Sequence, residues 1–83
     1  MASDVLQLCA ALVGQIRPIL AGQPPEVQGA VIADLLAIWL AGHHVAGDPD
    51  ATRELRGDLL ANHLLHVEQL VSVNAHLIGT TPP

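Results

Sequence analysis

Apolar residues recur along this chain in three stretches that have the spacing of helices. In the first stretch, from Val5 to Leu20, they return every three or four residues, which places them on one helical face. Pro18 lies inside this stretch, where a proline either kinks or ends a helix. The second stretch, residues 27–45, is apolar nearly all round, as in a central helix. The third, residues 49–78, has one polar and one apolar face.

Glycine and proline residues separate these stretches and set the expected helix ends. Pro25, in a GQPPE linker, suits the first position of a helix. Further along, Gly47 ends a helix, Asp48 can accept hydrogen bonds from the free amides of the next one, and Pro49 takes its first position. The sequence therefore predicts three helices, over residues 4–21, 25–45 and 49–78.

Short linkers make neighbouring helices run antiparallel, so we expect an all-α fold, a three-helix antiparallel bundle with a long third helix. Residues that face each other across the second linker should then have numbers that sum to about 94. By this count Pro25 lies opposite residue 69, and the last two turns of the third helix extend beyond the second. We expect a single helical domain over residues 1–79 and a flexible tail over residues 80–83.

Composition adds that the chain is unusually apolar for its length. Hydrophobic residues make up 51% of the 83 positions, with 14 Leu and 12 Ala, both good helix formers. Charged residues make up only 13%, against about 25% in an ordinary soluble domain. A domain this small buries only about 60–65% of its unfolded surface. The excess apolar surface therefore indicates burial against another chain, a ligand or a membrane.

The predicted overhang assigns this burial to the end of the third helix. A second copy of the chain is the most economical cover, since closed two-fold dimers are the commonest oligomers. We therefore expect a homodimer, with another protein as the alternative partner. The expected interface includes the single tryptophan, the chain's only aromatic residue, as an anchor, and consists of Trp39, Leu70, Val71, Val73, Leu77 and Ile78.

Charge excludes several other partners. The formal net charge is −5 and the chain has no lysine, so no basic stripe exists to neutralise nucleic-acid phosphates or anionic lipids. We expect Arg53 to pair with Asp50 or Glu54 on a solvated face, and Arg56 to lie on the same face or to pair with Asp34. Neither nucleic acid nor a charged membrane surface is an expected partner.

A membrane span and export are also not expected. Residues 27–45 form the best candidate span, but Asp34 interrupts them, His43 and His44 close them, and no Lys or Arg flanks them. The N-terminal segment carries Asp4 where a signal peptide would carry positive charge. We therefore expect a cytoplasmic protein.

Five histidines provide the main candidate chemistry. His63 and His66 are three residues apart on one helical face, a workable spacing for a divalent metal. Two ligands are too few for zinc, so a two-fold axis would have to supply a second pair. The alternative is that both histidines lie at the edge of the core. The pairing rule places His43 roughly 18 Å along the second helix from the level of His63, which argues against a histidine cluster within one chain.

Catalytic motifs are absent: there is no phosphate loop, no HExxH, no nucleophile elbow, no cysteine pair and no calcium loop. We therefore expect a non-catalytic oligomerisation or partner-binding module without a cofactor. The alternative is a helical bundle that binds a metal or small ligand around His63 and His66 at a symmetric dimer interface.

Overall fold

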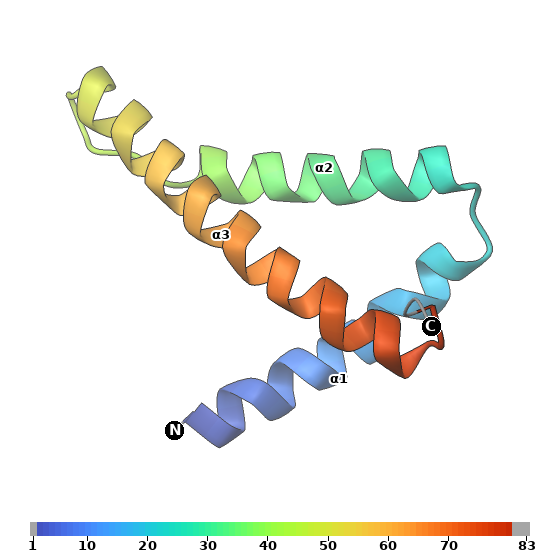
Figure 1. Ribbon diagram of the computed structural model, residues 1–83. Coiled ribbons are helices and arrows are strands. Elements are labelled where there is room, and N and C mark those ends of the chain that lie inside the picture. The colour runs from blue at the N-terminus through green and yellow to red at the C-terminus, as the bar shows by residue number, and fades with distance from the viewer. Residues whose placement is uncertain (1, 81–83) are drawn as a thin grey trace. The chain divides into compact units, whose positions relative to one another are not determined.

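Three helices account for most of this chain. The computed structural model describes residues 2–80, and within them it contains α1 (Ala2–Ala21), α2 (Pro25–Ala41), α3 (Pro49–Leu77) and no strand (Figure 1). The all-α class and the number of helices are confirmed. The antiparallel bundle and the dimer remain predictions.

The helix ends lie within two residues of the predicted ones except at the end of α2. Pro18 lies inside α1, which continues to Ala21, so this proline does not end the helix. α2 ends at Ala41 rather than at Val45, so the predicted second helix was four residues too long. His43 and His44 consequently belong to the loop and not to the last turn of a helix.

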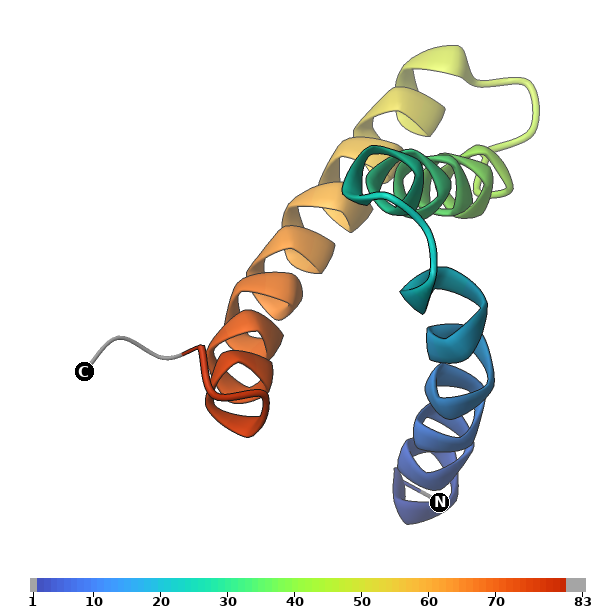
Figure 2. The same cartoon turned by 90° about the vertical axis from the view of Figure 1, so that its right-hand side faces the viewer.

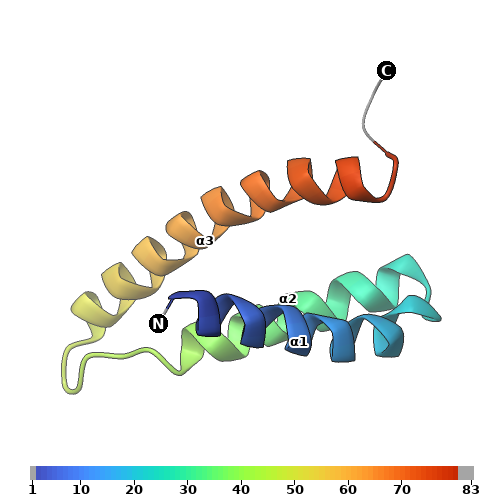
Figure 3. The same cartoon turned by 90° about the horizontal axis from the view of Figure 1, so that it is seen from below.

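The last turn of α2 closes with two backbone hydrogen bonds. The Gly42 amide donates to the Ile38 carbonyl at 3.1 Å, and the His43 amide donates to the Leu40 carbonyl at 3.0 Å. After these bonds the chain runs without helix to residue 48, as the α2–α3 connection in Figures 2 and 3 shows. Apolar periodicity alone did not reveal this end, because Val45 continues the pattern without being helical.

The start of α3 is built as the sequence predicts. Asp48 is the N-cap, with extended backbone angles of φ −131° and ψ 92°, and its side chain accepts a hydrogen bond from the Ala51 amide at 2.9 Å. Pro49 follows at the first helical position. Thr52 ties the loop to this first turn, because its hydroxyl oxygen accepts from the Val45 amide at 3.0 Å.

The turn before Asp48 depends on a glycine. Gly47 has a φ of +74°, in the left-handed region that L side chains rarely adopt, whereas Gly57 lies inside α3, where an added Cβ would meet nothing within 4 Å. Gly47→Ala should therefore destabilise the fold by about 1 kcal/mol, while Gly57→Ala should stabilise it by about 0.5–1 kcal/mol. Urea unfolding of both variants, followed by circular dichroism, checks the opposite signs. Equal shifts of the two midpoints would contradict this account of the turn.

The far end of α3 also stops where the sequence predicts. The Ile78 amide donates to the Asn74 carbonyl at 2.9 Å, and Gly79 has a φ of +78°. Thr80 closes the turn, since its amide donates to the Ala75 carbonyl at 2.8 Å. Of the predicted tail 80–83, the last three residues lie outside the described residues.

Contacts divide the chain into two compact units, Met1–Leu36 and Ala37–Pro83. In the first unit the Gln28 side chain donates from Nε2 to the Leu20 carbonyl at 2.8 Å, so a residue of α2 satisfies a carbonyl at the end of α1. The second unit holds the last turn and a half of α2, the loop and α3. The single domain expected over residues 1–79 remains a prediction.

Burial is partial throughout. Among the residues whose side chains the structure describes, none is buried. On α3 the half-buried positions fall on one stripe and stop near the middle of the helix; they are Ala51, Thr52, Leu55, Arg56, Leu59, Leu60 and His63. From residue 64 to residue 80 only Ala75 is half-buried, and the other positions are exposed. The second unit therefore packs around the first half of α3 and leaves the second half uncovered by its own contacts.

Candidate functional site

The junction between α2 and α3, within the second unit, is held by one arginine. Arg56 donates from Nε to the His43 carbonyl at 3.0 Å and to the Leu40 carbonyl at 3.2 Å, and from Nη2 to the Ala41 carbonyl at 3.0 Å. The last carbonyls of a helix have no partner within the helix, and a cation is favoured there by the helix dipole. Arg56 therefore caps the C-terminal end of α2 from the second turn of α3.

This role corrects two predictions. Arg56 was expected on a solvated face or paired with Asp34, but it is half-buried and its hydrogen bonds go to backbone carbonyls. Arg53 does behave as predicted, since its Nη1 lies 3.3 Å from Asp50 Oδ1 with both side chains at least 80% exposed. The same helix thus carries one arginine that organises the junction and one that stays in solvent.

The single tryptophan contacts two histidines of the same unit. The Trp39 ring is 5.1 Å from the His43 ring, centroid to centroid, in an edge arrangement, and 5.5 Å from the His63 ring at an interplanar angle of 42°. His43 Nδ1 lies 2.7 Å from the Trp39 carbonyl oxygen, which accepts, so Nδ1 carries the proton. Indole and imidazole rings from α2, the loop and α3 therefore form one cluster.

The cluster overturns the predicted separation of His43 and His63, which both contact the same indole. The pairing rule failed because it assumed a tight turn between the helices, whereas the first turns of α3 precede the residues that contact the end of α2. The pairs that face each other, Ala41 with Arg56 and Trp39 with His63, have numbers that sum to 97 and 102 instead of 94. A loop of seven residues, 42–48, shifts α3 relative to the end of α2 by up to two turns.

The two histidines of the predicted metal pair, His63 and His66, differ in their exposure to solvent. His63 is half-buried against Trp39, whereas His66 is exposed. Within residues 2–80 no group of three or more His, Cys, Asp or Glu side chains is placed to hold a metal ion. A site at His63 and His66 would therefore need ligands from a second chain, as the sequence analysis assumed, and this alternative stays a prediction.

The metal alternative has its own test. If a symmetric dimer binds a divalent ion through His63 and His66, protein purified without a His-tag should carry about one zinc per dimer by elemental analysis. The double variant His63→Ala, His66→Ala should lose the metal, while the exposed control His76→Ala should keep it. A metal-free preparation whose stability is unchanged by chelator and by added zinc rules the site out.

The predicted interface residues are exposed in the structure. Leu70 is 45% and Leu77 is 72% exposed. Val71, Val73 and Ile78 are 60%, 56% and 65% exposed. All five lie beyond His63: four of them are on the half of α3 that its unit leaves uncovered, and Ile78 is the C-cap of the helix. Trp39 differs, because it is 43% exposed but already packs against two histidines. Its assignment as an interface anchor stays a prediction, and so does the assignment of the other five residues to the interface.

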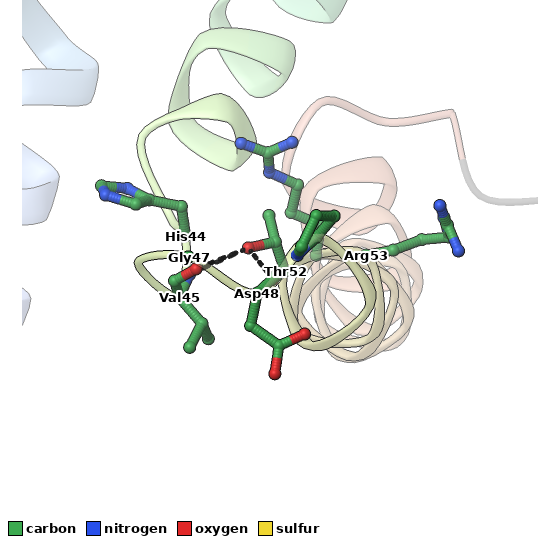
Figure 4. Close-up of a pocket in the computed structure, with 8 residues that line it drawn as sticks. His44, Val45, Gly47, Asp48, Thr52 and Arg53 are labelled. Atoms are coloured by element: carbon green, nitrogen blue, oxygen red, sulfur yellow. Dashed lines mark hydrogen bonds between the residues drawn. The ribbon is translucent and has the colours of Figure 1, made fainter.

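An open pocket of about 500 Å³ lies where the loop meets the first turns of α3. Figure 4 shows that the Thr52 hydroxyl points to the Val45 backbone, whereas the His44 and Arg53 side chains point away from each other. Polar groups that recognise a small ligand converge on it. This arrangement is therefore better explained as the cap and brace of a helix start than as a binding site.

Sequence reasoning missed Arg56 and Gln28, although each carried a signal. Arg56 continues the spacing of Thr52 and Leu60 on the half-buried stripe, and no Asp or Glu lies three or four residues from it. Such an arginine has to find acceptors elsewhere, and the free carbonyls of a preceding helix are the nearest ones. Gln28 plays the same part for α1: it lies near the start of α2, the helix after the linker, and donates to the Leu20 carbonyl at the end of α1.

One described helix is long and apolar enough to cross a membrane. It is α1, over Asp4–Ala21, with a mean hydropathy of 1.3, rather than the stretch 27–45 that the sequence analysis considered. The core helix of a soluble protein and a signal sequence meet the same criterion of length and composition. The expectation of no membrane span therefore stays a prediction.

Comparison with models of protein families, with curated proteins and with solved structures finds no match for this chain.

Proposed function

We propose that this protein is a non-catalytic helical interaction module whose apolar helix faces are covered by another protein surface, in the first place by a second copy of the chain. One observation carries the proposal: none of the side chains that the structure describes is buried, in a chain that is 51% hydrophobic. Among them, 22 large apolar side chains are each 37–72% exposed.

Exposure on this scale is costly in water. Removing apolar surface from water contributes about 25 cal/mol per Å², so leaving a Leu or Val side chain uncovered forgoes about 1.5–3 kcal/mol. Monomeric soluble proteins rarely expose large continuous apolar patches, and such patches mark sites of interaction. Seven large apolar residues of α3 beyond His63 are each 38–72% exposed, which offers apolar surface for such an interaction on a single helix.

The second half of α3 is the part that needs a partner most. An isolated helix of about 15 residues is only marginally stable in water, so residues 64–77 depend on packing to stay helical. Within their own unit they receive almost none, because the half-buried stripe ends at His63. A helical surface of matching apolar character would supply it, and a second α3 offers the same face.

Charge supports a protein partner. From residue 57 to residue 80 the chain carries no Lys or Arg and only two acids, Asp58 and Glu68, so the uncovered half of α3 is almost uncharged. The core of a protein interface is depleted in charge in the same way. A nucleic acid or an anionic lipid surface would require basic residues on this face.

The mass in solution tests the proposal. Light scattering at micromolar concentration should give at least twice the 8.7 kDa of one chain, and the mass should fall on dilution if the complex is weak. A mass of 8.7 kDa with cooperative thermal unfolding and no binding of a hydrophobic dye would overturn the proposal. That result would mean that the chain covers its apolar faces without a partner.

A further inference from the structure

We draw no further inference here: the strongest candidate, the open pocket formed by the α2–α3 loop and the first turns of α3 around Asp48, Thr52 and Arg53, rests on a helix N-terminus and has no second observation that points to a ligand.

Discussion

If a second chain covers α3 as proposed, Leu70→Asp and Leu77→Asp should each convert the oligomer into a monomer that keeps its helices up to the middle of α3. Both side chains lie on the uncovered half of α3, at 45% and 72% exposure, and neither contributes to the half-buried stripe of its unit. An aspartate at a dimer interface loses the burial of a leucine and places a charge in an apolar contact. Light scattering of each variant at the concentration used for the natural chain measures the change.

The expected effect is large because a symmetric interface contains each substitution twice. A loss of about 1.5–3 kcal/mol per leucine becomes about 3–6 kcal/mol per dimer, which weakens association by about 100-fold or more. Ser72→Asp is the matched control, since it adds the same charge to the same helix on its predicted polar face and should leave the mass unchanged.

Two outcomes would contradict this placement of the interface. If Leu70→Asp and Leu77→Asp stay oligomeric and equally stable, other faces form the contact. If the mass is monomeric for the natural chain and the variants only unfold more easily, the leucines pack within one chain. Circular dichroism of every variant distinguishes loss of association, which costs at most the helix of residues 64–77, from loss of the whole fold.

Arg56→Met should destabilise the fold by about 1–3 kcal/mol. The substitution keeps a long apolar side chain but removes the three hydrogen bonds to the carbonyls of Leu40, Ala41 and His43. Hydrogen bonds from a charged donor are worth more than neutral ones, although partial exposure of Arg56 lets water replace part of the loss. Urea unfolding at a fixed protein concentration measures the shift.

Arg53→Met is the natural control for this measurement. It removes the same charge one turn earlier on α3, where Arg53 forms an ion pair with Asp50 and both side chains are largely exposed. Its effect should stay below about 0.5 kcal/mol, as for other exposed ion pairs. Equal effects of the two substitutions would mean that net charge, and not the cap on α2, is what Arg56 contributes.

Arg56→Lys tests whether the positive charge of Arg56 or the planar shape of its guanidinium group stabilises the end of α2. A lysine keeps the positive charge near the end of α2 but lacks the planar guanidinium that reaches three carbonyls at once. Its stability should fall between those of the natural chain and Arg56→Met.

Local signals in the sequence predicted most helix ends. The cap at Asp48, the proline at position 49 and the stop at Gly79 act through bonds between residues close in sequence, so their effect can be read without a fold. The end of α2 could not be read in this way. Val45 continues the apolar pattern, and the end of the helix at Ala41 is capped by Arg56, 15 residues later in the chain.

The contacts of the histidines with Trp39 could likewise not be predicted from local sequence patterns. The position of His63 on the inner face of α3 follows from its spacing to Leu55 and Leu59, and the structure places it there. Its contact with Trp39 does not follow from spacing, because it depends on where the loop lets α3 begin relative to α2. The path of the loop over residues 42–48, and not the error in the end of α2, therefore moved the neighbour of His63 by about two turns.

By itself, the sequence determined the helical class, the number of helices, the capped start and glycine stop of α3, and the surplus of apolar surface. These properties are local or compositional, and they follow from hydrogen-bonding groups and side chains within a few residues of each other. Only the tertiary structure decided that α2 ends at Ala41, that Arg56 caps it and that Trp39 brings His43 and His63 together. The bond from Arg56 to Ala41 and the contact of His63 with Trp39 join residues 15 or more positions apart, through a loop whose path no local pattern specifies.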